Sequence, residues 1–373
     1  MKVVGLLNLF DSPSLGNLTK TRTLASTSFL GRFTPMDFSL SNFANSGIDE
    51  INILIRDNFR SVAKHVGSIK SWVNNTKIGR QNLLLNEKGL FDEDYNTDIN
   101  CLLENDWVLF QAKAELIVIQ PAHIITTMDL RPIIEEHYKE KRDITIVYKS
   151  IDNANESFAG SDVLTVENGL ATSAQPNNKR NKKANVSLET YVISMDFIKK
   201  NYKQFVDQPT VNSFKKVIRY LINNKICDVH AHEYVYYARC LDSLKHFMDY
   251  SFELFDVNLA NEVFRPDWPI YTLTHDTPPA TYGNNAKVIN SFISNGTIID
   301  GHVENSVLSR RVVVKKGAVV KNSIILTRTV IEEGAHIENV LIDKYSHVCK
   351  NAVVKGTTEK PKFIAQGKNI LWK

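Results

Sequence analysis

The side chains best suited to chemistry are a few charged and nucleophilic residues that follow predicted strands. Asp11, His123, Cys240 and Asp242 each stand at or near such a place. A carboxylate at a strand end can hold Mg²⁺, and an imidazole can bind a transition metal. Competing structural roles are more ordinary: a lone histidine is usually a hydrogen-bonded structural residue, and Asp242 is well placed to cap a helix predicted over Leu244–Phe255.

Positive charge that could hold an anion is concentrated at a few places. The basic run Lys179, Arg180, Lys182, Lys183 has no apolar residue among its neighbours, so it predicts a solvated loop. Arg22 and Arg32 lie on the segment after the first strand and could attract an anion. Ordinary ion pairing is the alternative for both arginines.

The elements that must position these side chains alternate along the first 255 residues. Short apolar runs separated by amphipathic stretches predict an α/β domain with a mostly parallel, Rossmann-like sheet, whose ligands bind at the carboxyl ends of the strands. The predicted strands are Val3–Leu7, Ile51–Ile55, Leu116–Ile119, Ile144–Tyr148 and Thr190–Ile193. The predicted helices are Ser61–Val73, Arg131–Lys139 and Phe214–Asn223.

Prolines break this alternation between residues 256 and 285. Pro266, Pro269, Pro278 and Pro279 forbid a continuous helix and predict an extended interdomain linker.

Residues 286–373 carry a different period. Aliphatic residues recur every six positions, and a 17-residue echo repeats Asn305-Ser306 at Asn322-Ser323 and in part at Asn339. A six-residue period predicts a left-handed parallel β-helix whose every sixth side chain points inward. The predicted inward ladder is Val307, Val313, Val319, Ile325, Ile331 and Ile337, then Ile342, Val348 and Val354. Val312, Val314, Val320 and Ile324 are predicted to face outward, as an apolar surface for association.

The composition is that of an ordinary globular protein. The formal net charge is +4 over 373 residues, which gives no reason to expect nucleic acid or a membrane surface as partner. Four cysteines show no paired spacing, and neither a signal peptide nor a membrane span is visible, so a cytoplasmic location is expected.

Motifs over nearly the whole chain resemble the ADP-glucose pyrophosphorylase (glucose-1-phosphate adenylyltransferase) family. That family joins a nucleotidyltransferase domain to a hexapeptide β-helix. The matching segments are Asp37–Asn42 with Asn45–Ile48, Ser61-Val62 with His65-Val66, Asp267–Thr272 with Pro278–Ala280, and Asn290-Ser291.

The family's glycine-rich phosphate cradle is altered here. Leu9, Phe10 and Ser12 stand in place of its glycines, which let backbone N–H groups approach the phosphates. Ser14 replaces the cradle arginine, and Leu24 replaces the lysine of the Lys-Pro pair.

Three further positions that the resemblance makes functional have also changed. The metal-binding aspartate after the Leu116–Ile119 strand corresponds to Ala122 or His123. Gln175 replaces the lysine that holds the sugar phosphate, and Cys240 replaces the second metal-binding aspartate. Because four separate sites have lost their chemical group, we expect no catalytic residue, no bound metal and no cofactor in this chain.

The resemblance implies a GlgD-type, non-catalytic subunit that regulates a catalytic ADP-glucose pyrophosphorylase in glycogen biosynthesis. Its partner would be that catalytic subunit, in a heterotetramer in which Mg²⁺ belongs to the partner, and a small-molecule effector is possible.

Two other functions stay open on the sequence. One is an active nucleotidyltransferase with relocated metal ligands. The other is a hexapeptide-repeat acyltransferase with His302, His336 or His347 as catalytic residue, which the long α/β domain argues against.

Overall fold

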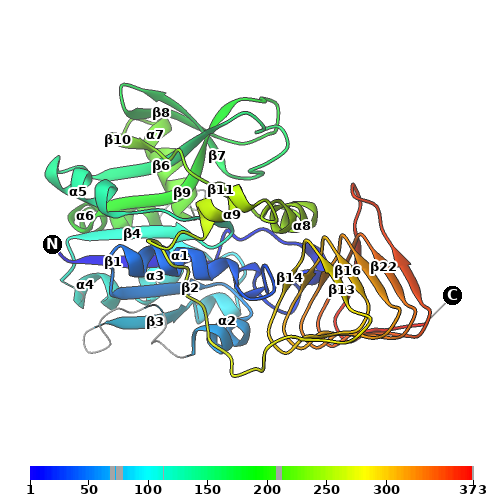
Figure 1. The fold of residues 1–373 in the computed structure, drawn as a ribbon. Helices are drawn as coiled ribbons and strands as arrows, with labels where there is room; N and C mark the ends of the chain where they lie inside the picture. Colours follow the sequence, from blue (N-terminus) through cyan, green and yellow to red (C-terminus); the bar gives the residue numbers. More distant parts are fainter. Residues whose placement is uncertain (68–71, 73–78, 112, 207–211, 372–373) are drawn as a thin grey trace. The chain divides into compact units, whose positions relative to one another are not determined.

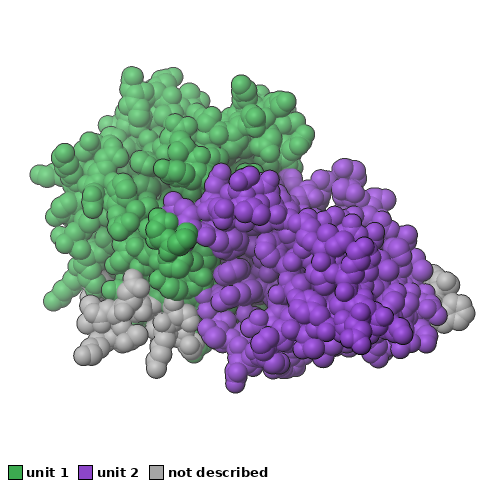
Figure 2. All heavy atoms as spheres, viewed as in Figure 1, with its two compact units in different colours: residues 1–13, 36–242, 266–271 green, residues 14–35, 243–265, 272–373 purple. Residues whose placement is uncertain are grey.

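The computed structural model describes residues 1–67, 72, 79–111, 113–206 and 212–371, and these form two compact units. Unit 1 comprises residues 1–13, 36–242 and 266–271, and unit 2 comprises 14–35, 243–265 and 272–373. Figure 2 colours the units green and purple. The division differs from the sequence-based boundaries at 255 and 286, because residues 14–35 and 243–265 make their contacts with the repeat segment.

Unit 1 is built on a nine-stranded sheet of order β3-β2-β1-β4-β9-β6-β10-β8-β7 (Figure 1). Strands β3, β2, β1 and β4 are mutually parallel, whereas β9 runs antiparallel to both β4 and β6. The sheet is therefore mixed beyond β4. Its strands are β1 (Val3–Asn8), β2 (Glu50–Ile55), β3 (Arg80–Leu85), β4 (Leu116–Pro121), β6 (Ile144–Ile151), β7 (Asp162–Glu167), β8 (Leu170–Pro176), β9 (Ala184–Ser194) and β10 (Val229–Glu233).

Helices cover this sheet with the apolar faces that the sequence indicated. The helices of unit 1 are α1 (Pro35–Asn45), α2 (Phe59–Val66), α3 (Asp98–Glu104), α4 (Trp107–Gln111), α5 (Arg131–Lys139), α6 (Met195–Val206) and α7 (Phe214–Asn223). In α7, Val217, Ile218 and Leu221 join Ile144 and Ile193 of the sheet in one buried core. The predicted bounds of α5 and α7 are confirmed. Helix α2 ends at Val66, and residues 68–71 and 73 of the longer prediction lie outside the described residues.

Unit 2 contains α8 (Leu244–Glu253), α9 (Val257–Val263) and a parallel β-helix (Figure 1). Three parallel sheets form its faces, of order β12-β15-β18-β21-β24-β27, β13-β16-β19-β22-β25 and β14-β17-β20-β23-β26. The strands are β12 (Thr281–Tyr282), β13 (Lys287–Ile289), β14 (Phe292–Ile293), β15 (Ile298–Ile299), β16 (His302–Glu304), β17 (Val307–Leu308), β18 (Val313–Val314), β19 (Val319–Lys321), β20 (Ile324–Ile325), β21 (Val330–Ile331), β22 (His336–Glu338), β23 (Val340–Ile342), β24 (His347–Val348), β25 (Val353–Lys355), β26 (Lys362–Ile364) and β27 (Asn369–Ile370).

In the structure, the first three residues of the inward row of the β-helix lie one position later than predicted. Val313 and Val319 are only half-buried, whereas Val314 and Val320 lie in the interior. The interior row is Leu308, Val314 and Val320, then Ile325, Ile331 and Ile337, then Ile342, Val348 and Val354. One coil therefore advances by steps of six, six and five residues, and tandem aliphatic pairs conceal the five-residue step.

The outward apolar surface predicted for this unit was wrong for the same reason. Val312, Val314, Val320 and Ile324 are each at most 2 % exposed. They stabilise the unit from within and offer no surface for association.

Within the described residues, no helix is both long and apolar enough to cross a membrane.

Candidate functional site

In the segment that follows β1, large apolar side chains fill the place where the family has its glycine-rich phosphate loop. Leu9 and Phe10 are buried, and the backbone N–H of Phe10 donates to Oδ1 of Asn8. Nδ2 of Asn8 in turn donates to Asp98 at 2.7 Å. A phosphate cradle needs free N–H groups beside small residues, so this loop does not provide one. Of the other altered cradle positions, Ser12 buries its hydroxyl in unit 1, whereas Ser14 is exposed and Leu24 is buried, both in unit 2.

A buried ion pair lies in unit 1 between α7 and β9. Nζ of Lys215 is 3.1 Å from Oε1 of Glu189, and the two side chains are 16 % and 6 % exposed. Asp11 interacts electrostatically with both. Burial tends to lower the pKa of Lys215, but Glu189 and Asp11 outweigh it and raise that pKa. The Lys215 ammonium is thus a fixed cation among carboxylates.

Glu189 is held in an unusual backbone conformation. Its φ is +50°, and the pairing of β9 with β6 shifts register between Val147 and Tyr148, opposite this residue. Left-handed backbone is rarely adopted by residues other than glycine and marks positions that the surrounding structure enforces. Ser187 Oγ accepts from the Glu189 N–H at 3.0 Å, which supports the irregularity.

His123 lies beside this pair as a neutral side chain. It is 3 % exposed, and its Nε2 is 3.6 Å from Oε2 of Glu189. Burial first, and the nearby charge of Lys215 second, lower the pKa of His123 to about 3. The imidazole is therefore uncharged at neutral pH.

The two positions expected to carry metal-binding carboxylates meet at a small sheet. Strand β11 (Ala238–Cys240) pairs with β5 (Ile124–Thr126), and the Leu241 N–H donates to the carbonyl of His123 at 2.8 Å. Ala122 and Cys240 are fully buried, and burial raises the pKa of the Cys240 thiol well above its usual value.

These residues do not fit a magnesium ion. Mg²⁺ requires oxygen ligands, whereas the two expected positions carry an alanine or a neutral imidazole and a buried thiol. The nearby carboxylate of Glu189 is already paired with the Lys215 ammonium. Within the described chain, no three His, Cys, Asp or Glu side chains converge as a metal site would require.

Asp242 has a different role from the predicted one. Ser243 caps α8, because its side chain accepts from the N–H of His246. Oδ2 of Asp242 accepts from the N–H of Ala159 at 2.8 Å. The carboxylate thus fixes a loop.

The position expected to hold a sugar phosphate, Gln175, is exposed to solvent. It lies near the end of β8. Lys179 is exposed too, and its Nζ donates to the carbonyl of Glu156 at 3.2 Å. The neighbouring basic residues are also exposed, as a solvated loop requires.

Arg22 forms an ion pair, which was the alternative left open by the sequence, and the pair is buried. Within unit 2, Nη1 and Nη2 donate to the two carboxylate oxygens of Asp343 at 2.9 and 2.6 Å. The two side chains are 5 % and 2 % exposed. This bidentate pair uses the guanidinium internally, so the suggested anion site at Arg22 does not form.

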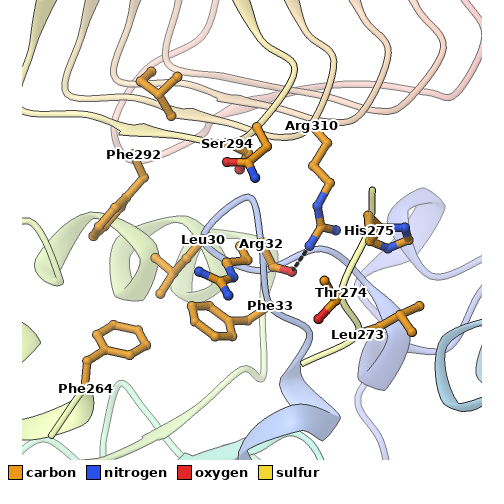
Figure 3. A pocket seen from close by; sticks show the side chains of 12 residues that line it. Leu30, Arg32, Phe33, Phe264, Leu273, Thr274, His275, Phe292, Ser294 and Arg310 are labelled. Carbon is orange, nitrogen blue, oxygen red and sulfur yellow. Dashed lines mark hydrogen bonds between the residues drawn. The ribbon is translucent and has the colours of Figure 1, made fainter. Parts of the chain in front are cut away.

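Arg32 lines a cavity of about 380 Å³ inside unit 2 (Figure 3). Arg310 and His275 line it as well, above an apolar floor that includes Phe33 and Phe264. The Arg310 side chain donates to the carbonyl of Arg32 at 3.2 Å. Two guanidinium groups beside aromatic rings suit a small organic anion.

Sequence reasoning missed Glu189, Lys215, Asp98 and Asp343. One signal was available, since lysines at 215 and 216 open a helix whose first turn holds no acid. Cations there oppose the helix dipole and imply carboxylates nearby. The other three residues carried no local signal.

Comparisons with known proteins match both parts of the chain. Residues 14–161 match the nucleotidyl transferase family, and residues 278–362 match the GlmU-like C-terminal hexapeptide family. The glucose-1-phosphate adenylyltransferase of Thermotoga maritima is 29% identical over 311 residues, which cover 82% of this chain and 73% of that protein. The enzyme of the same name from Lachnospira eligens is 28% identical, covering 81% and 71%.

A further relative matches over most of both chains. The glycogen biosynthesis protein GlgD of Bacillus subtilis is 30% identical over 364 residues, covering 95% of this chain and 92% of that protein. The chain therefore belongs to the family of glycogen biosynthesis protein GlgD and the glucose-1-phosphate adenylyltransferases.

Proposed function

We propose that this protein is a catalytically deficient, regulatory subunit of glucose-1-phosphate adenylyltransferase, the enzyme that makes ADP-glucose and pyrophosphate from ATP and glucose 1-phosphate. It acts by binding the catalytic subunit in the cytoplasm. The observation that carries the proposal is the partly buried Lys215 ammonium, paired with Glu189 beside the neutral His123, near the positions at which the resemblance expects the Mg²⁺ ligands of the reaction.

The loop after β1 supports the same conclusion. Leu9 and Phe10 are packed into the core of unit 1, so the backbone cannot close on a triphosphate. A subunit of this kind changes its partner only by preferring one of the partner's conformations, which is a binding effect and requires no chemistry of its own.

The experiment is an assay of pyrophosphate release with ATP, glucose 1-phosphate and Mg²⁺. We expect no turnover above background from the isolated chain, and a changed rate or substrate affinity when it is mixed with the catalytic subunit. Turnover by the isolated chain that disappears in His123→Gln or Asp242→Asn would favour the alternative, an active nucleotidyltransferase with relocated ligands.

The cavity around Arg32 supports a binding role for a small anionic effector. Arg32 and Arg310 supply positive charge, and the aromatic floor supplies apolar contact area. We expect phosphorylated sugars or carboxylates to raise the melting temperature of the protein, and Arg32→Ala to weaken that effect. Lys179→Ala, an exposed cation of unit 1, is the matched control and should leave it unchanged.

A further inference from the structure

A second cavity of unit 2, with a volume of about 650 Å³, lies between α8 and one corner of the β-helix. Figure 1 shows α8 beside the first coils near β14, and the rings of Phe255 and Phe292 are 5.1 Å apart. The loop between β25 and β26 adds Thr357 and Thr358 to the lining.

The β-helix side of this cavity is a row of four asparagines. Asn290, Asn305, Asn322 and Asn339 stand at the same corner of successive coils and all line the cavity. Nδ2 of Asn290 donates to Oδ1 of Asn305 at 2.7 Å. Coils stacked through parallel strands are spaced by about 4.8 Å, so the row presents amides at that repeat.

Backbone conformation alone does not explain four asparagines. Their φ values lie between 43° and 53°, a left-handed conformation that asparagine tolerates well. A second corner of the same β-helix is also left-handed, yet it holds Arg311, Arg328 and Tyr345 with φ of 58°, 59° and 60°. This chain therefore accepts other side chains in that conformation. The corner that faces the cavity carries an asparagine in four successive coils, whereas the described left-handed residues at the other corners of the β-helix are mixed: Asn351 is there, but so are arginines, a tyrosine and glycines.

We propose that this cavity binds a neutral, polyhydroxylated ligand, an oligosaccharide. Beyond the bond between Asn290 and Asn305, the amides offer further donors and acceptors that match neighbouring hydroxyl groups, and Thr357 and Thr358 add hydroxyls. Phe252 and Phe255, whose rings stack 5.7 Å apart, supply an apolar surface for the C–H face of a sugar ring. This binding is independent of the proposed role toward the catalytic subunit.

The cavity disfavours two other ligand classes. Asp249, Glu253 and Asp256 line it, and no lysine or arginine does so among the described residues, so an anion would be repelled. An extended peptide repeats its same-side groups every ~6.7 Å, out of register with a row at ~4.8 Å.

Saturation-transfer NMR and calorimetry with maltohexaose and cellohexaose as probes test the proposal. We expect saturable binding of at least one of them to the full chain. In the double variant Asn305→Gly, Asn322→Gly the affinity should fall about tenfold or more, because the amides are lost without straining the left-handed backbone. Asn351→Gly is the matched control, since Asn351 has a φ of 58° but does not line the cavity.

Three outcomes would overturn the proposal. The first is that neither probe shows saturable binding. The second is that Asn351→Gly loses as much affinity as the double variant. The third is that a lysine-rich peptide binds more tightly than the probe, displaces it, and itself loses affinity in the double variant. Melting curves of the variants establish that each is folded.

Discussion

Lys215 forms a partly buried ion pair with Glu189 in unit 1. Its ammonium is held by Glu189 and sits near Asp11 in a largely water-free place. The ammonium neutralises the carboxylates, and it would repel a divalent cation and fill the space beside Glu189 that such an ion would need. On the proposed function, this ion pair is the feature of the packing that disfavours a metal ion in this region.

Replacing Lys215 by Met should destabilise the protein by about 3–5 kcal/mol, because Glu189 and Asp11 are left buried without a counter-charge. Lys216→Met is the control. That side chain is exposed and donates to Asn212 at 2.7 Å, so little change is expected. Urea unfolding of both variants measures the difference, and equal free energies of unfolding would contradict a structural ion pair.

Burial of His123 should make the free energy of unfolding of the protein depend on pH in the acid range. The folded pKa of His123, about 3, is lower than the 6.5 of an exposed histidine, chiefly because of burial. The unfolded chain therefore binds this proton more readily, and stability falls as pH drops below 6.5 toward 3, by roughly 1.4 kcal/mol per pH unit.

In His123→Gln that part of the slope should disappear. His275→Gln, at an exposed position, should keep it. Free energies of unfolding measured from pH 7 to pH 4 decide the matter, and parallel profiles for wild type and His123→Gln would show that folding does not lower the pKa of His123.

At the scale of elements, the β-helix depends on which residue of each aliphatic pair points inward. Val320 is buried in the interior, whereas its neighbour Val319 is only half-buried. Because each coil rests on the next, a defect in one should spread to its neighbours.

The pair Val320→Asp and Val319→Asp tests this directional assignment. Val320→Asp places a charge in an apolar interior and should cost several kcal/mol, whereas Val319→Asp should cost about 1 kcal/mol or less. Thermal melts of the two variants compare them. A larger loss in Val319→Asp would place the inward row one residue earlier, as the six-residue spacing alone suggested.

The Arg22–Asp343 pair joins the segment 14–35 to the β-helix within unit 2. Two parallel hydrogen bonds in a buried setting make it a strong and specific contact. Arg22→Met should cost about 3–5 kcal/mol, because Asp343 is then buried without its partner.

The double variant Arg22→Met, Asp343→Leu should recover much of that loss, since no unpaired charge remains. Unfolding free energies of the single and double variants give the coupling between the residues. Additive losses would mean that the two side chains act independently.

At the scale of the whole molecule, the proposed function predicts assembly with a catalytic relative. Burial of Val312, Val314, Val320 and Ile324 removes the apolar surface first expected to drive association. A contact with the partner must use other surfaces, which include exposed residues such as Tyr282 and Ile298 on the first coils.

We expect light scattering on a size-exclusion column to show a mixed tetramer, of two chains of each kind, when this protein and the catalytic subunit are combined. Each protein run alone is the control. Two unchanged peaks in the mixture, with unchanged kinetics of the partner, would reject the regulatory-subunit proposal.

The sequence alone determined the two architectures, because hydrophobic periodicity reports which faces are buried. Helices α5 and α7 and the strands of the α/β domain follow from local pattern, and the six-residue repeat predicts the β-helix. It also located the altered positions Leu9, Phe10, His123 and Cys240. Each of these is a single residue that can be compared with a motif.

Only the tertiary structure decided how charges distant in sequence are paired. Lys215 meets Glu189, and Arg22 meets Asp343 across 321 positions, which no local pattern encodes. The sequence also left undecided which valine of each adjacent pair in the early coils points inward, because either choice fits the repeat. The pairing of the strands places Val314 and Val320 in the interior. The type of a side chain determines which interactions it can make, whereas the packing of distant segments determines which partner it contacts.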